Sequence, residues 1–116
     1  MKVIGLISGT STDGVDAALL EISGKGVESQ LKLLAFETYP YSEDLRRRLM
    51  EVSSGHGSVG EVCHLNFYLG ELFSRAAFQV AKKVGVSMDE VELIGSHGQT
   101  VMHFPQPVTE RGIKIR

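Results

Sequence analysis

A short polar turn between two apolar runs constrains the fold of this 116-residue chain more than any other feature. The apolar runs, residues 3–7 and 17–22, predict a strand on each side of a tight turn. The turn consists of Gly9, Thr10, Ser11, Thr12, Asp13, Gly14, Val15 and Asp16. Small residues let backbone N–H groups approach an anion, and carboxylates beside a phosphate need a cation between them, which indicates a magnesium-nucleotide site. Plain hairpin turns use the same residue types, so the residues alone leave both interpretations open.

Composition and charge bound the class of protein. The length allows one domain, and a hydrophobic content of 42% is sufficient for a core. Twelve basic and 14 acidic residues give a net charge of −2, which provides no electrostatic basis for binding nucleic acid or an anionic membrane surface. The basic run 46–48 lies among acidic residues and is interpreted as a solvated helix face.

The single cysteine, Cys63, excludes an internal disulfide and fits a reducing compartment. Because it lies between apolar helix positions, we expect a buried structural thiol rather than a nucleophile. The sequence shows no signal-peptide pattern and no apolar stretch near the roughly 20 residues that a membrane span needs. These observations predict a cytoplasmic protein.

The pattern of apolar residues predicts the order of the elements. Strands are expected at about residues 2–7, 15–22 and 27–38, and their short connections predict an antiparallel meander. Ser42 is a candidate N-cap of a first helix. Ser58 and Glu61 form a capping-box pattern at the start of a long helix that Gly85 ends. Its apolar face consists of Val62, Leu65, Leu69, Leu72, Ala76 and Val80, widened by Phe73, Ala77 and Val84.

A second polar cluster follows the last apolar run. Residues 91–95 predict a short buried strand, and the cluster after it consists of Ser96, His97, Gly98, Gln99 and Thr100. If this strand lies parallel to the first one, both polar clusters lie on the same rim of the sheet. The tail 109–116 begins a strand pattern and completes no element. The order predicts a ribonuclease-H-like α/β fold with a mixed sheet, incomplete at its C-terminus.

The two clusters carry a family resemblance. Residues 8–16 resemble the N-terminal signature of the anhydro-N-acetylmuramic acid kinases, and residues 94–101 resemble their second hallmark, with His103 and Pro105 also in place. The spacing between them and the long helix also fit, the latter through Asn66, Leu69, Gly70 and Phe73. The resemblance covers essentially the whole chain.

The resemblance implies membership of the superfamily of acetate and sugar kinases, heat-shock cognate ATPases and actin. Kinases of this family use ATP and Mg²⁺ on 1,6-anhydro-N-acetylmuramic acid. Water opens the 1,6-anhydro bond, the freed 6-oxygen takes the γ-phosphoryl group, and the product, N-acetylmuramic acid 6-phosphate, feeds cell-wall recycling. The implied partners are this amino sugar and ATP, and neither nucleic acid nor a membrane is implied. The resemblance is also compatible with a homodimer of the full-length protein.

The resemblance also assigns roles to the two clusters. It implies that residues 9–16 form the first phosphate loop, that Asp13 holds magnesium through water, and that residues 96–100 face the sugar. His97 and Gln99 are suited to hold sugar hydroxyls, and Gly98 allows a close approach. Family members are about three times as long, with a second domain and a catalytic aspartate expected beyond Arg116. We therefore expect residues 1–116 to be the N-terminal part of the first domain and to be inactive alone.

Two alternatives stay open at this point. One is another sugar or acetate kinase of the same superfamily. The other is a non-catalytic truncated domain that pairs through an open sheet edge. The chain has no P-loop motif, no Gly-x-Ser-x-Gly elbow and no zinc spacing, which excludes the protein classes that those patterns define.

Overall fold

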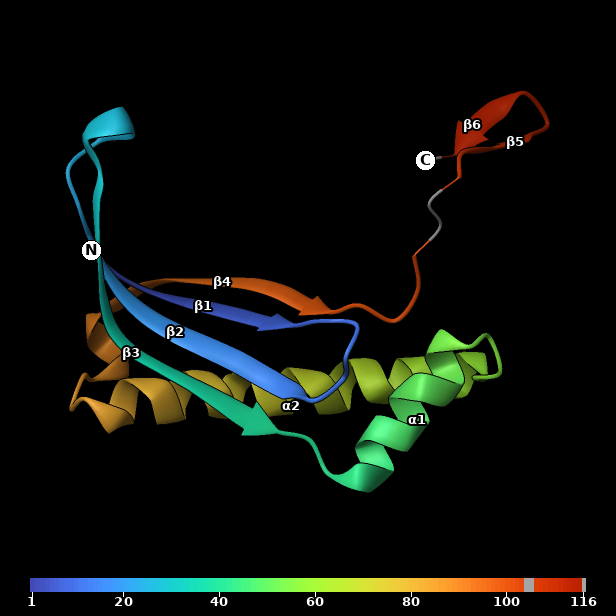
Figure 1. The fold of residues 1–116 in the computed structure, drawn as a ribbon, viewed down its shortest axis with the longest axis horizontal. Coiled ribbons are helices and arrows are strands. Elements are labelled where there is room, and N and C mark those ends of the chain that lie inside the picture. Colours follow the sequence, from blue (N-terminus) through green and yellow to red (C-terminus); the bar gives the residue numbers. More distant parts are fainter. Residues whose placement is uncertain (104–105, 116) are drawn as a thin grey trace.

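A four-stranded mixed sheet forms the centre of the fold. The computed structural model describes residues 1–103 and 106–115. The strands run in the order β3-β2-β1-β4 (Figure 1). They are β1 (Lys2–Ser8), β2 (Gly14–Ser23), β3 (Gln30–Pro40) and β4 (Val91–Gln99). The first three are antiparallel neighbours, and β4 is parallel to β1. This confirms the predicted meander and the predicted parallel pair.

Two helices follow the meander. The long helix α2 (Val59–Lys83) lies along one face of the sheet, and α1 (Glu43–Ser53) lies against the N-terminal half of α2 (Figure 1). The hydroxyl of Ser42 accepts a hydrogen bond from Leu45 N at 3.2 Å, and that of Ser58 accepts one from Glu61 N at 3.0 Å. Both predicted N-caps are thus confirmed, because each serine oxygen satisfies a backbone N–H of the first turn.

The core lies between α2 and the face of the sheet that it covers. Alternate strand residues point to the same face, and the residues buried there are Ile4, Leu6 and Ser8 of β1 and Val15, Ala17 and Leu19 of β2. The largest fully buried side chains are Ile4, Leu19, Leu45, Leu49, Leu65, Val15 and Val80. Leu65, Leu69, Ala76 and Val80 of the predicted apolar stripe lie in this core, together with Phe73 and Ala77. Val62 and Val84 are exposed, so the prediction is wrong for these two residues.

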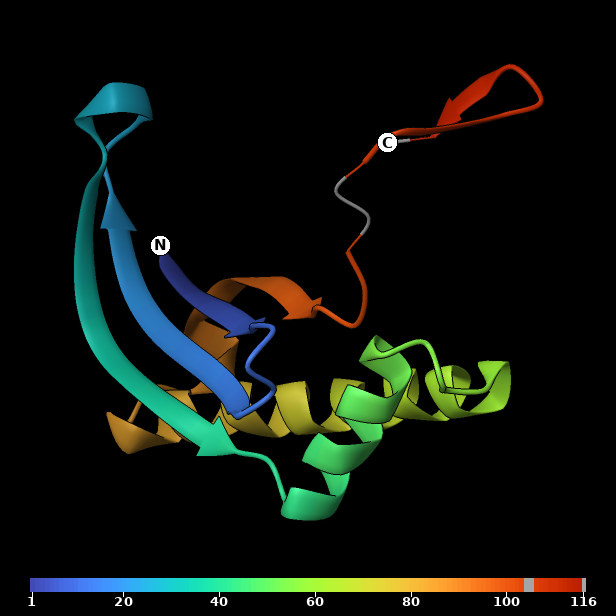
Figure 2. The same cartoon turned by 45° about the vertical axis from the view of Figure 1, so that its right-hand side comes forward.

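The opposite face of the sheet carries exposed apolar side chains. No helix among the described residues covers this face (Figure 2). Phe36 is 52% exposed and Leu93 54% exposed. The expectation that residues 91–95 form a buried strand is therefore wrong. Within the described part of the chain β4 is an edge strand, and residues 92–97 are exposed on both of its sides.

Several predicted boundaries also change. The third strand begins at Gln30 rather than at residue 27, because η1 (Gly26–Glu28) forms a 3₁₀ turn at the tip of the β2–β3 hairpin. The second polar cluster lies largely within β4 and not after it. The tail forms a separate hairpin of β5 (Val108–Glu110) and β6 (Ile113–Ile115), away from the sheet in Figure 1. A further 3₁₀ turn, η2 (Met88–Glu90), precedes β4. Pro105 and Arg116 lie outside the described residues.

Cys63 is exposed, so the prediction of a buried thiol is wrong. The cysteine lies two residues before Leu65, whose side chain is buried, and it shares an open surface with His64 and Phe67. Neighbouring positions on a helix point in different directions, so apolar neighbours in the sequence did not place Cys63 in the core. No helix in the described part of the chain is both long enough and apolar enough to cross a membrane.

Candidate functional site

The carboxyl ends of β1 and β4 bring the two polar clusters together. Residues 9–13 leave the end of β1, and Ser8, the last residue of β1, pairs with Gln99 at the end of β4. Ligands of open α/β sheets bind beyond the carboxyl ends of such strands. The structure therefore places both predicted clusters on one rim of the sheet (Figure 1).

The first cluster forms a loop held by its own backbone. Thr12 N donates to the carbonyl of Gly9 at 3.3 Å, and the Thr12 hydroxyl donates to the carbonyl of Ser11 at 2.7 Å. Thr12 is 3% exposed and has a positive φ of 53°, a conformation that costs a residue with a Cβ about 1–2 kcal/mol. Its side chain thus fixes the loop from inside, whereas Gly9, Thr10 and Ser11 are exposed.

The later residues of the first cluster have structural roles. Gly14, Val15 and Asp16 lie within β2, and Val15 is buried in the core. A Cβ on Gly14 would lie 2.3 Å from the carbonyl oxygen of Tyr39, so the close approach of β3 requires glycine there. The loop itself is tied to the chain after β3 by a 2.9 Å hydrogen bond from Tyr41 N to the carbonyl of Asp13.

The two carboxylates of the first cluster lie in different surroundings. Asp13 is exposed at the loop, beside the hydroxyl groups. Asp16 lies on the open face of the sheet, where its carboxylate accepts a 2.6 Å hydrogen bond from the Thr38 hydroxyl. Asp13 is therefore the better placed of the two to reach a cation bound at the loop.

The second cluster surrounds an irregularity in β4. Gly98 has a φ of 75°, and its N–H donates to the Ser96 hydroxyl at 3.2 Å. His97 is exposed, whereas Gln99 and Thr100 are partly buried. The Gln99 amide binds Ser8, Gly9 and Thr100 of the chain itself. Ser96 and His97 are therefore more accessible to a ligand than Gln99, whose amide already binds the chain itself.

A cavity of about 360 Å³ lies between this cluster and the helices. Its walls are largely apolar and come from both helices and β4: Val52, Val62, Leu65, Asn66, Leu69, Gly70, Phe73, Ser96, His97, Gly98, Gln99 and Val101. An apolar cavity with a few convergent polar groups is the usual form of a small-molecule site. The sequence indicated the polar rim and placed Val62 on an apolar helix face, but it gave no signal that Val52 and Val62 would line a cavity.

The residues of the loop fit a nucleotide phosphate and magnesium. Exposed hydroxyls and a glycine with no atom within 4 Å of its Cβ position leave room for phosphate oxygens. In the described part of the chain no three His, Cys, Asp or Glu side chains gather as a metal site. Magnesium needs no such cage, because it usually keeps several waters and binds one or two carboxylates together with the phosphates.

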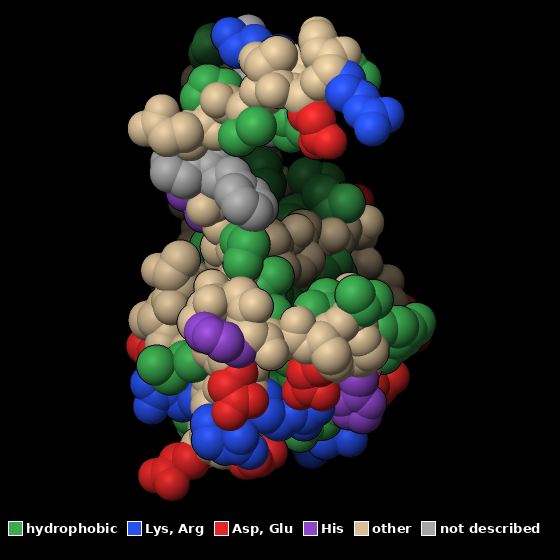
Figure 3. All heavy atoms as spheres, turned by 90° about the vertical axis from the view of Figure 1, so that its right-hand side faces the viewer, with side chains coloured by type: hydrophobic (Ala, Val, Ile, Leu, Met, Phe, Trp, Pro, Cys, Tyr) green, Lys and Arg blue, Asp and Glu red, His purple; other side chains and the backbone are tan. Residues whose placement is uncertain are grey.

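The charges near the site are paired and mixed in sign. Figure 3 shows Lys, Arg, Asp and Glu side chains interspersed over the end of the molecule where the two helices meet. Arg47 pairs with Asp44 at 2.6 Å and with Glu51 at 2.9 Å, and Arg46 and Arg47 are exposed, which confirms the solvated helix face for these two residues. Arg48 is only partly exposed and pairs with Glu61 of α2, so the prediction is wrong for Arg48. Next to the loop, burial raises the pKa of Tyr41, whose hydroxyl has no partner among the described residues.

These features define a class of protein. A mixed sheet with a polar loop after β1 and a second polar cluster at the end of the parallel strand β4 is the architecture of the N-terminal domain of actin-like sugar kinases. More specifically, the chain belongs to the anhydro-N-acetylmuramic acid kinase family, whose family model matches residues 1–116.

Individual relatives agree with the family model. The chain is 45% identical over 115 residues to an anhydro-N-acetylmuramic acid kinase of Caldanaerobacter subterraneus subsp. tengcongensis, a match that covers 98% of this chain and 29% of the relative. It is 43% identical over 108 residues to the kinase of the same name from Bacillus cereus strain AH187, covering 92% of this chain and 28% of that protein. The chain thus spans less than a third of the length of these relatives.

Proposed function

We propose that residues 1–116 supply the first phosphate loop and part of the sugar site of a kinase that phosphorylates 1,6-anhydro-N-acetylmuramic acid. Membership of the family supports the reaction class. The observation that carries the proposal is the meeting of the loop after β1 with the cluster of β4 on one rim, because phosphoryl transfer depends on holding donor and acceptor side by side.

In the proposed reaction, the oxygen of a water molecule bonds to the anomeric carbon while the bond from that carbon to the 6-oxygen breaks. The 6-oxygen takes the γ-phosphoryl group, ADP leaves, and the products are N-acetylmuramic acid 6-phosphate and a proton. Magnesium ATP supplies the phosphoryl group and neutralises its developing charge. The use of ATP places the reaction in the cytoplasm.

The residues of this chain would bind and orient the two substrates. Thr10 and Ser11 would donate hydrogen bonds to phosphate oxygens, and Asp13 would hold magnesium through water. Ser96 and His97 would contact the hydroxyls of the sugar at the mouth of the cavity. The base that takes the proton from water is assigned to a residue beyond 116, so residues 1–116 alone should form no product.

A mass-spectrometric assay tests the proposal. Residues 1–116 would replace the matching segment of the Caldanaerobacter kinase, and this hybrid kinase would be incubated with magnesium ATP and the anhydro sugar. We expect N-acetylmuramic acid 6-phosphate from the hybrid and none from residues 1–116. Preferential phosphorylation of acetate or of another sugar would assign the chain to a different branch of the superfamily.

A further inference from the structure

The side-chain amide of Gln99 is almost fully occupied by the chain itself. Its oxygen accepts a hydrogen bond from Ser8 Oγ at 2.6 Å, and its nitrogen donates to the carbonyls of Gly9 at 2.8 Å and Thr100 at 2.9 Å. A glutamine amide has two N–H donors and one oxygen with two lone pairs. Both donors are therefore used, and a single lone pair remains for a ligand.

The partners also fix which way the amide points. The carbonyls of Gly9 and Thr100 only accept hydrogen bonds, so the nitrogen of Gln99 must face them. Its oxygen then faces Ser8, whose hydroxyl must donate. Ser8 is 2% exposed, which shields this hydrogen bond from water. Reversing the amide would set its oxygen against the carbonyls of Gly9 and Thr100 and take the donor from both, which is unfavourable.

An irregular register brings Gln99 to this position. Leu6 pairs with Ser96, but Ser8 pairs with Gln99, so two steps along β1 match three along β4. The additional residue lies next to Gly98, whose φ of 75° is readily adopted only by glycine. A shift of one residue moves a side chain to the other face of a strand. The bulge therefore points Gln99 to the side of Ser8.

We propose that Gln99 is a positioning residue that holds the first phosphate loop in place, and that it does not bind the sugar. The inference rests on the proposed function and deepens it. The hydrogen bond to the Gly9 carbonyl fastens the first residue of the loop to β4, which lies 90 residues further along the chain. The loop and the sugar-facing cluster then keep a fixed separation, on which in-line transfer depends.

Two variants of the hybrid kinase test this role. Gln99→Ala removes all three hydrogen bonds, and Ser8→Ala keeps Gln99 but removes the donor that fixes its oxygen. The probe is a fluorescent ATP analogue with Mg²⁺, titrated in the absence of sugar. We expect each variant to bind the analogue about tenfold more weakly, as the loss of one hydrogen bond in Ser8→Ala and of three in Gln99→Ala predicts, with the KM for the anhydro sugar within about twofold of the unmodified hybrid.

The control is Gln30→Glu, an amide-to-acid change at the exposed start of β3. It should alter neither the affinity for the ATP analogue nor the KM for the anhydro sugar. Thermal unfolding of each variant establishes that it is folded. A rise in the sugar KM with unchanged nucleotide affinity, or unchanged values of both constants, would overturn the proposal. An inactive unmodified hybrid would count against the proposed function. The nucleotide titration does not depend on turnover, so it would still test whether Gln99 holds the phosphate loop, and unchanged nucleotide affinity in Gln99→Ala would overturn that role.

Discussion

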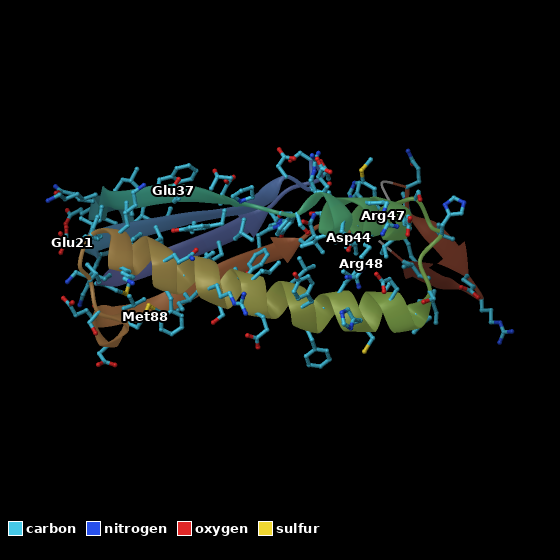
Figure 4. The ribbon with its side chains drawn as sticks, turned by 90° about the horizontal axis from the view of Figure 1, so that it is seen from below. Glu21, Glu37, Asp44, Arg47, Arg48 and Met88 are labelled. Atoms are coloured by element: carbon cyan, nitrogen blue, oxygen red, sulfur yellow. The ribbon has the colours of Figure 1, made fainter. Side chains whose placement is uncertain are left out.

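Arg48 of α1 and Glu61 of α2 are joined by a hydrogen-bonded ion pair of 2.6 Å, and Figure 4 places Arg48 between the two helices. Glu61 was predicted to complete a capping box by bonding back to the N-terminal end of its own helix. Ser58 does cap α2, but the Glu61 carboxylate binds Arg48. The complete capping box forms at Ser87 and Glu90. Glu61 thus connects the two helices that form the cavity wall.

This ion pair predicts a pH-dependent stability. The hydrogen bond from Arg48 holds the pKa of Glu61 below its ordinary value of 4.5. The stabilisation is therefore present above the pKa of the unfolded state and is lost as the pH falls through the lower folded value. Glu61→Gln should lower the free energy of unfolding in urea at pH 7, and the difference should vanish once the pH lies below the folded-state pKa of Glu61.

The control for this prediction is Glu51→Gln, which removes an exposed pair within α1. It should change stability less at pH 7, because such a pair connects no separate elements. A Glu61→Gln difference that stays constant from neutral to acid pH would show that the carboxylate charge does not contribute.

Gly14→Ala should destabilise the chain by about 1–3 kcal/mol, because the new Cβ would collide with the backbone of β3. The collision lies where Tyr41 N holds the carbonyl of Asp13, so nucleotide binding should weaken as well. Gly60→Ala in the first turn of α2 is the matched control: its Cβ would be 3.8 Å from the nearest side-chain atom, and alanine favours helix. Urea unfolding compares the two variants. Equal stability of Gly14→Ala and the unmodified chain would contradict the close approach of β3.

Tyr41→Phe should raise the free energy of unfolding by about 1 kcal/mol. The Tyr41 side chain is 8% exposed, and its hydroxyl lies near Ser8 but makes no hydrogen bond of good geometry among the described residues, an arrangement that costs free energy. Urea unfolding measures the change, with Tyr68→Phe on the exposed side of α2 as the control. A loss of stability in Tyr41→Phe would mean that the hydroxyl has a partner in solution.

Local signals predicted much of this fold. Local residue patterns determine the N-caps at Ser42 and Ser58, the first two strands and the apolar stripe of α2. Such patterns can be recognised in the sequence without knowledge of distant contacts. The shared rim of the two clusters was predicted on the condition that β4 lies parallel and next to β1, and the structure meets that condition.

Features that depend on distant contacts were not predictable. An apolar run such as residues 91–95 suits a central or an edge strand, and only the surrounding elements decide which one forms. Cys63 was misplaced because a helix position shows its exposure only once its neighbours are packed. The role inferred for Gln99 depends on one additional residue in the pairing of β4 with β1, and the sequence alone does not reveal a register.

The uncovered face of the sheet predicts self-association of residues 1–116. Ile7, Phe36 and Leu93 all lie on the face that α2 does not cover, and exposed apolar patches of this kind drive association. Size-exclusion chromatography should show species larger than a monomer, and Phe36→Lys should shift the elution toward the monomer. Phe67→Lys, at an exposed position of α2, should have a smaller effect. A monomer at high concentration without any substitution would contradict the prediction.

The magnesium assignment is tested by comparing the two aspartates of the first cluster in the hybrid kinase. Asp13 is exposed at the loop, whereas the Asp16 carboxylate is held by Thr38 on the open face of the sheet. Asp13→Asn removes the charge that would attract the cation, so the Mg²⁺ concentration needed for half-maximal activity should rise by about tenfold. Asp16→Asn keeps an oxygen that can accept from Thr38, and its effect should be much smaller. Titration of activity with Mg²⁺ at fixed ATP separates the two variants. A larger effect of Asp16→Asn would contradict the assignment and would indicate that the metal contact lies on β2. In that case the Asp16 carboxylate would bind a magnesium-bound water in place of the Thr38 hydroxyl.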